Sequence, residues 1–406
     1  MPGNAASSSM PPALERRLKY AGPALFSYGF RPFFLGGAIW SVACIVLWIP
    51  QFTGELALRT AFAPLDWHIH EMLYGYIAAV IAGFLLTAIP NWTGRLPIAG
   101  APLMGLAALW LAGRLAILFS GFVGIALAAV VDIAFLATLA LVAAREIVAG
   151  RNWRNLRVLA AIGVLIAGNV AFHAEVYRFG RADYGTRIGI AAAIMLISLV
   201  GGRIVPSFTR NWLARREAGR LPAPFSRFDV VAIAVSLLAL ALWAALPQGP
   251  IAGLALIAAA IMQGVRLARW AGERTAADRL VLVLHAGYAF VPVGFAFTGA
   301  AMLAPAIPAS VGIHAWTAGA IGLMTLAVMT RASLGHTGHP LAAGRGTEAI
   351  YLLALGAAVL RMAAGVAGSM LLMELASAAW VAAFGGFVLL YGPMLYRERP
   401  IWAGRD

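Results

Sequence analysis

The chain has a single cysteine and few charged residues, and both shortages restrict what it can be. Cys44 is the only cysteine among 406 residues, which excludes intrachain disulfides, thiolate zinc sites and covalent haem attachment through a C-x-x-C-H motif. Charged residues make up 11% of the sequence and hydrophobic residues 62%, with a mean hydropathy of +0.85. This composition excludes a water-soluble globular protein and is typical of a polytopic membrane protein.

Long apolar runs dominate the rest of the sequence. They are about 20 residues long, the length that an α-helix needs to cross the hydrocarbon core of a bilayer. Helices are expected because backbone polar groups in lipid must be hydrogen-bonded within their own segment, and the runs lack the alternation of β-barrel strands. The sequence therefore predicts an all-α, polytopic transmembrane helical bundle. Its twelve spans are expected near residues 33–52, 67–89, 98–119, 122–144, 156–178, 186–205, 229–246, 250–269, 278–302, 307–331, 347–368 and 371–396.

Positive charge is distributed unevenly between the two sides of this arrangement. With the N-terminus on the inner side, 24 of the 30 Lys and Arg residues fall in inner segments and 4 in outer segments. Cytoplasmic loops of membrane proteins carry such an excess of Lys and Arg, so both termini are predicted to be cytoplasmic. The same rule accounts for the net charge of +14 without a nucleic-acid partner.

The spans fall into two sets of six. The predicted organisation is an N-terminal tail at 1–31, a first transmembrane half at 32–205, a basic cytoplasmic loop at 206–228, a second half at 229–396 and a C-terminal tail at 397–406. The N-terminal tail is polar and rich in Pro, Ser and Gly, unlike a cleaved signal peptide. Because many transporters consist of two six-helix halves, a transporter is one functional interpretation.

The seven histidines separate into two groups by their depth in the predicted membrane. Histidine is the commonest metal ligand among side chains and can stay neutral in an apolar bundle, so the grouping predicts two separate metal sites. The alternative for each residue is a hydrogen-bonded side chain between helices. The outer group is His68, His70, His173 and His314, and the inner group is His285, His336 and His339.

The segment WHIHE at residues 67–71 opens the second span. His68 and His70 are two residues apart and point about 200° apart on a regular helix, so both bind one ion only if the first turn is unwound. His68 and Glu71 are three residues apart and are expected to share a helix face. The spacing in this segment therefore does not define a metal site by itself.

Four ionisable residues are expected inside the membrane, namely Glu71, Arg114, Asp132 and Glu175. An Arg or Asp at the centre of a lipid-facing helix costs about 2.5–3.5 kcal/mol, so these side chains are predicted to face the bundle interior and pair with one another. One interpretation is an ion pair around Arg114 that fixes helix packing. The other is a proton relay through Glu71, Glu175 and Asp132 beside a metal site.

Six sequence blocks occur in order along nearly the whole chain. They are FSYGFRPFFLGGAIW (26–40), WHIHEMLYGY (67–76), AIPNWTGR (88–95), GGRIVPSFTRNW (201–212), HAGYAFVPVGF (285–295) and HAWTAGAIGLMTLAVMTRASLGHTGHP (314–340). Together they resemble the NnrS family of bacterial membrane proteins. The resemblance implies a twelve-helix, multi-pass protein of the bacterial inner membrane that contains haem and copper and is linked to nitric oxide and nitrosative stress.

The resemblance also supplies candidate ligands, because five histidines lie in the matching blocks. His173 joins them from its membrane depth alone. His339 stands where the family commonly has an arginine-like residue, so it is not assigned as a ligand. The five histidines in the blocks are His68, His70, His285, His314 and His336.

Haem is assigned to the inner group because basic side chains surround it. Guanidinium groups suit planar carboxylates, so three arginines are expected to hold the haem propionates. Without a cysteine pair for covalent attachment, the expected form is haem b. The predicted haem site comprises His285, His336, Tyr288, Arg95, Arg203 and Arg331, and the predicted copper site comprises His68, His70, His173 and His314.

The sequence leaves three functions open. The first is a haem and copper protein in the lipid bilayer that binds nitric oxide and reduces or otherwise detoxifies it, with electrons from a membrane donor such as quinol. The second is a transporter of a metal, haem or small solute with a histidine-lined transit site. The third is a sensor or sequestering protein that binds the gas without turnover. The product and the oligomeric state are not determined by the sequence.

Overall fold

The computed structural model describes residues 20–398 except 21, 217, 247 and 305. The outer parts of the two predicted tails, residues 1–19 and 399–406, therefore lie outside the described residues. Within the described ranges the chain contains helices and no strand, and twelve helices are long and apolar enough to cross a membrane. The prediction of an all-α bundle with twelve spans is confirmed.

Eight spans are single helices and four contain more than one helical segment. The single helices are α2 (Phe30–Phe52), α5 (Ala101–Leu118), α7 (Ile125–Ala149), α9 (Tyr184–Leu213), α10 (Arg227–Ala245), α12 (Arg279–Leu303), α15 (Arg345–Ala367) and α16 (Met370–Tyr396). The second span is α3 (Pro64–His70), η2 (Glu71–Tyr76) and α4 (Ile77–Thr93), and the fifth is η3 (Trp153–Asn155) and α8 (Leu156–Phe179). The eighth is α11 (Pro250–Ala268) and η4 (Gly272–Arg274), and the tenth is α13 (Ala309–His314), η5 (Ala315–Ile321) and α14 (Gly322–Thr337). The short elements η1 (Ala24–Phe26) and α6 (Ser120–Val123) lie at the ends of spans.

Local sequence signals account for several span boundaries. α10 begins at a capping box in which the side chains of Ser226 and Asp229 accept from each other's backbone, which satisfies N–H groups at the helix start. The carboxylate of Asp278 caps α12 in the same sense. α11 begins with Pro250, whose fixed φ suits the first helical turn. α4 ends at Gly94 with φ 70°, a left-handed conformation that glycine adopts without strain.

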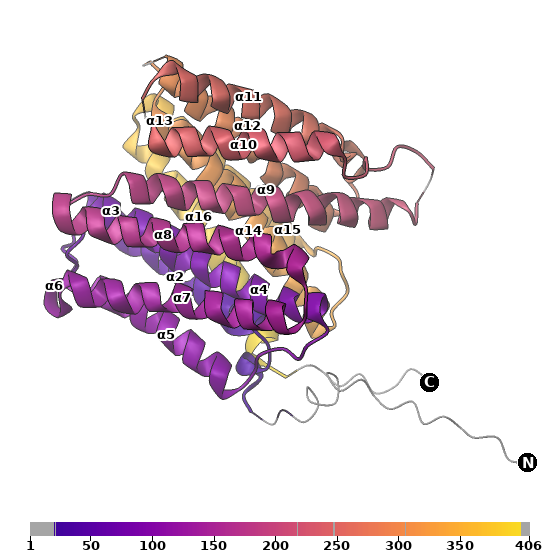
Figure 1. The fold of residues 1–406 in the computed structure, drawn as a ribbon, viewed down its shortest axis with the longest axis horizontal. Coiled ribbons are helices and arrows are strands. Elements are labelled where there is room, and N and C mark those ends of the chain that lie inside the picture. Colours follow the sequence, from indigo (N-terminus) through magenta and orange to yellow (C-terminus); the bar gives the residue numbers. More distant parts are fainter. Residues whose placement is uncertain (1–19, 21, 217, 247, 305, 399–406) are drawn as a thin grey trace, which may run out of the picture.

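The second and tenth spans form the centre of the bundle. Their most apolar windows are 78% and 67% buried inside the protein, compared with 33% for α5 and α10 at the periphery. The hydroxyl groups of Tyr76 and Thr325 lie 2.5 Å apart and link the two central spans. The helices run roughly parallel or antiparallel to one another along the long axis of the molecule (Figure 1). Side chains of the central spans are thus shielded by the surrounding helices.

Both central spans contain a π-helical segment that starts directly after a histidine. The segment η2 follows His70 in the second span, and η5 follows His314 in the tenth. Hydrogen bonds from residue i to i+5 are rare and are frequently found at functional sites. The apolar periodicity of the chain gave no sign of these segments, which lie between the two histidines and the helices α4 and α14.

The first and last spans lie side by side, since α16 packs against α2. Arg31 near the start of α2 donates from Nη1 to the carbonyl oxygens of Leu395 and Arg397, each at 2.9 Å. The start of the first span and the end of the last therefore share one end of the bundle, as an even number of spans requires. The cytoplasmic location of that end, and the division into two halves at 206–228, stay predictions.

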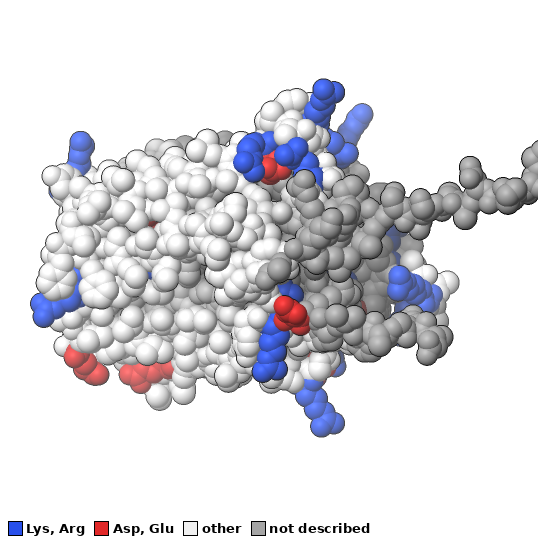
Figure 2. All heavy atoms as spheres, turned by 90° about the horizontal axis from the view of Figure 1, so that it is seen from below, with Lys and Arg blue, Asp and Glu red and all other residues white. Residues whose placement is uncertain are grey.

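The surface agrees with a membrane environment. Figure 2 shows a broad band without Lys, Arg, Asp or Glu between two ends that carry charged side chains. Charged residues are costly in the hydrocarbon core and acceptable at its two boundaries. The many exposed leucines, valines and isoleucines of the outer helices, such as Leu141 and Leu389 at 71% and 77% exposure, then face lipid rather than water.

A buried polar network joins α9, α10, α11 and α12. Arg266, only 1% exposed, donates from Nε to Asp229 Oδ1 at 3.1 Å and from Nη1 to the hydroxyl of Tyr288 at 3.0 Å. Nη1 also lies 3.0 Å from the carbonyl oxygen of Ser198. Tyr288 donates to Gln263 Oε1 at 2.7 Å. Tyr288, a residue of the predicted haem site, therefore uses its hydroxyl to join α12 to α11, while Arg266 connects α11 to α9 and α10.

The substitution Arg266→Met is expected to destabilise the protein by about 3–5 kcal/mol, because it leaves the buried carboxylate of Asp229 without its partner. The measurement is the unfolding midpoint of the purified protein in detergent. Arg279→Met is the matched control, since Arg279 is 50% exposed and 3.6 Å from Glu348, and an exposed pair contributes at most about 1 kcal/mol. An unchanged midpoint in Arg266→Met would contradict the structural role of the network.

Candidate metal centre and adjoining cavity

Three side chains from three spans converge in the interior, and we call them the triad. His70 ends α3, Asp132 lies in α7 and His173 lies in α8, and each residue is at most 4% exposed. One ligand atom from each lies within 4.8 Å of the others. Asp132 Oδ2 is 3.2 Å from His70 Nε2 and 3.0 Å from His173 Nε2. Two imidazoles and a carboxylate form a donor set for a divalent transition metal such as copper, iron or zinc.

Close helix packing and one amide hold the triad in place. α5 approaches α7 at Gly113, where a Cβ atom would lie 3.2 Å from the Cα of Asp132. Asn169, about one turn before His173 on α8, donates from Nδ2 to Asp132 Oδ2 at 2.8 Å. Its Oδ1 lies 3.2 Å from His70 Nε2. The sequence analysis missed Asn169, because an amide in an apolar span carries no charge and no ligand motif.

A buried glutamate and a buried arginine lie next to the triad. Glu71 Oε1 accepts from His70 Nδ1 at 2.9 Å and from Arg114 Nη1 at 2.8 Å, and Glu71 Oε2 accepts from Trp40 Nε1 at 2.6 Å. Arg114 also donates from Nη2 to Asp132 Oδ1. The structure therefore brings three of the four predicted intramembrane ionisable residues into one cluster. The prediction that Glu71 shares a helix face with His68 is wrong, because the carboxylate of Glu71 contacts Arg114 at the start of η2.

The cluster lacks positive charge. Arg114 faces two carboxylates, so with neutral imidazoles the buried side chains carry a net charge of −1. Both ring nitrogens of His70 face oxygen acceptors, whereas a neutral imidazole carries one N–H. Nδ1 of His173 is buried and has no hydrogen-bond partner among the described residues. A cation beside His70 Nε2 would correct both the charge and the excess of acceptors, so the residues fit a metal ion.

The contact between His70 and Glu71 also favours ligation through one particular nitrogen. A carboxylate that accepts from Nδ1 fixes the tautomer and the ring orientation, which leaves Nε2 available to a metal. His70 Nε2 is the nitrogen that faces Asp132 and Asn169. The carboxylate of Glu71 thus lies behind the imidazole ring, on the side away from the other triad residues.

His68 belongs to a different site, a cavity of about 440 Å³ between the second and tenth spans. The ring of His68 stacks on Trp48 with centroids 4.1 Å apart, and its Nδ1 is buried without a hydrogen-bond partner in the described structure. His314 lines the same cavity and donates from Nδ1 to the carbonyl oxygen of Ser310 at 2.7 Å. That bond fixes the tautomer of His314 and leaves Nε2 as a free ligand atom. Other cavity walls come from Met72, Tyr76, Ile313, Thr317 and Trp380.

Arg361 of α15 lines this cavity as well. Its side chain makes no hydrogen bond or ion pair with any residue in the described part of the chain. An unpaired guanidinium beside an apolar cavity is costly unless an anionic group pairs with it. No role is predicted for Arg361 from the sequence alone, although an arginine inside the predicted span at 347–368 was the available signal.

Comparison with known sequences identifies the protein family. The profile described as NnrS protein matches residues 24–399. The chain belongs to the NnrS family. No curated protein matches the sequence significantly. With its twelve candidate spans, the chain is a multi-span membrane protein of this family, as the sequence blocks predicted.

The remaining candidate residues of this NnrS protein have other surroundings. Glu175 is separate from the triad, because its carboxylate accepts from the backbone N–H groups of Tyr184 and Gly185 at 3.0 and 2.8 Å and caps α9. His285 Nε2 lies 2.8 Å from Thr209 Oγ1, and its Nδ1 is buried without a described partner. His336 packs against the ring of Tyr28, with centroids 5.5 Å apart. The predicted inner pair of histidines thus contacts different residues.

The three arginines assigned to haem propionates are also engaged elsewhere or exposed. Arg95 forms an ion pair with Glu146. Arg331 lies over the ring of Phe208 at 4.1 Å, and Arg203 is exposed. Arg361, by contrast, lies beside the histidine-lined cavity and has no hydrogen-bond or ion-pair partner in the described structure.

A divalent metal is expected to stabilise the metal-depleted protein through the triad. Cu²⁺ at 100 times its dissociation constant should add about 2.7 kcal/mol to the free energy of unfolding, measured by thermal unfolding together with the metal content per chain. His173→Ala should abolish this increment, whereas Glu175→Gln, outside the triad, should retain it. Equal stabilisation of wild type and His173→Ala would show that the metal binds elsewhere.

Proposed function

We propose that this NnrS protein binds a copper ion at the triad and haem b in the cavity between His68 and His314, and that it reduces nitric oxide. The observation that carries the proposal is the segment at residues 67–71. His68 faces the cavity, whereas His70 faces the triad, so one helical turn contributes a ligand to two sites at once. A haem iron and a copper ion, when bound, supply redox chemistry and binding sites for nitric oxide.

The dimensions and chemistry of the cavity support haem there. A volume of about 440 Å³ falls within the range of about 300–1,000 Å³ typical of cofactor sites. His68 and His314, which offer available ring nitrogens, would hold the haem iron, and the unpaired guanidinium of Arg361 would hold a propionate. The sequence analysis assigned haem to His285 and His336, but the contacts of those rings favour roles in helix packing. The haem proposal therefore moves to the outer group of histidines.

The surroundings of the two sites support a reaction of a small apolar gas that consumes protons. Nitric oxide partitions into lipid and can reach a cavity walled by apolar and aromatic side chains without a water-filled channel. Glu71 and Asp132 form a hydrogen-bonded chain with Arg114 and His70, and such a chain can hold and move a proton. Electrons come from a membrane donor such as quinol. Glu175, which caps α9, has no part in this proposal.

The haem assignment is tested by four alanine variants purified in parallel. His68→Ala and His314→Ala are expected to lose bound haem, whereas His285→Ala and His336→Ala should retain it, because only the first pair lines the cavity. The measurement is the Soret absorbance and the extractable haem per chain. Loss of haem from the second pair with retention in the first would refute the cavity assignment and restore the inner one.

The reaction is tested by anaerobic consumption of nitric oxide with an added electron donor. Glu71→Gln is expected to lower the rate by about 10²–10⁴-fold, the usual contribution of a positioned acid or base, while haem content stays at the wild-type level. Glu175→Gln is the control and should leave the rate unchanged. If wild-type protein binds the gas spectroscopically but consumes none, the protein sequesters nitric oxide and the proposed reduction is incorrect.

A further inference from the structure

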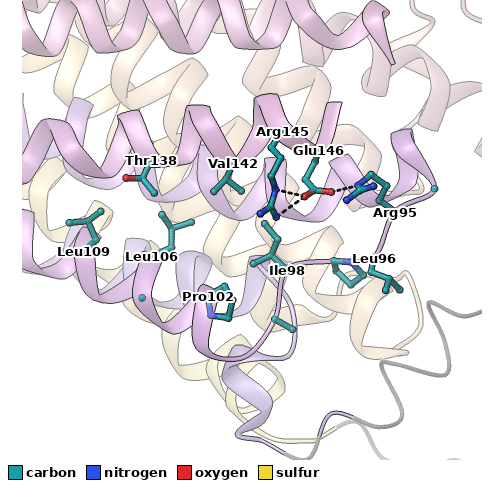
Figure 3. A pocket seen from close by; sticks show the side chains of 14 residues that line it. Arg95, Leu96, Ile98, Pro102, Leu106, Leu109, Thr138, Val142, Arg145 and Glu146 are labelled. Carbon is teal, nitrogen blue, oxygen red and sulfur yellow. Dashed lines mark hydrogen bonds and ion pairs between the residues drawn. The ribbon is translucent and has the colours of Figure 1, made fainter. Parts of the chain in front are cut away.

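A deep crevice separates α5 from α7 at the end of the bundle where α4 also ends. The two helices touch at Gly113 and Asp132 and diverge toward Pro102 on one side and Glu146 on the other (Figure 3). The crevice has a volume of about 920 Å³ and is closed at one end by the loop at 94–100. It lies apart from the triad and from the histidine-lined cavity, and neither of the proposed cofactors accounts for it.

The walls of the crevice are apolar and leave space. They are formed by Ile98, Leu106, Leu109 and Val142. A Cβ atom added to Gly105 would meet no heavy atom within 4 Å. From Thr138 to Glu146 the crevice follows α7 for roughly 12 Å, at 1.5 Å per residue. An extended hydrocarbon chain entering from the surrounding lipid fits a slot of this shape and polarity.

The rim of the crevice carries two arginines and one glutamate (Figure 3). Glu146 Oε2 accepts from Arg95 Nε, and Oε1 accepts from Arg145 Nε at 3.0 Å and Nη2 at 2.8 Å. Both carboxylate oxygens therefore accept from arginine. The two Nη groups of Arg95 and Nη1 of Arg145 donate to no residue in the described ranges. The rim thus has a net positive charge and guanidinium donors to spare, and its carboxylate is already paired with both arginines.

The positive charge and the spare guanidinium donors determine the kind of head group that the rim can bind. A neutral head group, such as that of a quinol, would leave the spare guanidinium donors at the rim without an anionic partner. A phosphate supplies negative charge and several acceptor oxygens, which guanidinium groups bind well. Basic pockets at the membrane boundary are known to bind anionic lipid head groups.

We propose that the crevice between α5 and α7 binds a phospholipid with an anionic head group. The phosphate lies between Arg95 and Arg145, and an acyl chain lies along Leu106, Leu109 and Val142. The site depends on the helix geometry alone and not on the proposed haem or copper. Because α5 and α7 also carry Arg114 and Asp132 nearer the opposite end, the lipid helps to fix the distance between the helices that hold that buried pair.

The test is native mass spectrometry of the full chain, released from membranes that contain phosphatidylglycerol and phosphatidylethanolamine in equal amounts. Wild-type protein should retain one phosphatidylglycerol per chain through repeated detergent washing. Arg145→Gln removes part of the head-group site, and Gly105→Leu fills the crevice without changing a charge. Arg145→Gln should lower retention by about tenfold or more, as expected from the loss of a charge-assisted contact. Gly105→Leu should also lower retention, because its side chain occupies the space of the acyl chain. Arg154→Gln, at an exposed residue in η3, is the matched control and should retain the lipid.

Four outcomes would overturn the proposal. They are unchanged retention in Arg145→Gln and Gly105→Leu, equal loss in Arg154→Gln, equal retention of phosphatidylethanolamine, and recovery of a quinone in place of phospholipid. Displacement of the lipid by inorganic phosphate alone would show a site for free anions and would also count against it. If Gly105→Leu does not fold, Arg145→Gln compared with Arg154→Gln still decides the question.

Discussion

The buried contact of Arg114 with Glu71 and Asp132 is the interaction on which the interior of the first six spans depends. It joins α5 to α7 and to the start of η2, and all three side chains are at most 1% exposed. Removing one partner from such a group leaves an uncompensated charge, which is strongly destabilising. The same contact leaves one carboxylate charge unbalanced next to two imidazoles. The packing of these helices and the excess negative charge beside the imidazoles thus have a single electrostatic origin.

The short segment at residues 67–71 connects that centre with the rest of the protein. His70 and His68 point to different sides of α3. His70 faces the other triad residues, and His68 faces the cavity. The cavity is lined equally by the first six spans, through α2, the second span and α9, and by the second six, through the tenth span, α15 and α16. The cavity and the triad therefore share one helical turn, and a change in the position of α3 would alter both.

The sequence was sufficient to predict the transmembrane spans but not which side chains meet in the bundle interior, and the reason is physical. Helix length in lipid is set by the thickness of the bilayer, so hydropathy alone located all twelve spans. The sixth and tenth helices continue past their predicted ends at 205 and 331, to Leu213 and Thr337. Membrane depth also placed His70 and His173 in the same layer. It gave no information on lateral packing, which separates His68 from His70, directs Glu175 to the start of α9 and engages Tyr288 with Arg266. Arg361 was visible in the sequence, but its partner-free position beside His314 depends on how α15 packs.

The π-helical segments have a consequence for how the chain tolerates insertions and deletions. Such a segment contains more residues per turn than the α-helix around it. Losing one residue from η2 would restore ordinary α-helical winding and rotate α3 by about 100° relative to α4. The imidazole of His70 would then no longer lie beside Asp132, although the span would still cross the bilayer. The length of this stretch is therefore constrained more tightly than its amino-acid composition, and homologues that keep the histidines are expected to keep the residue count between them and α4.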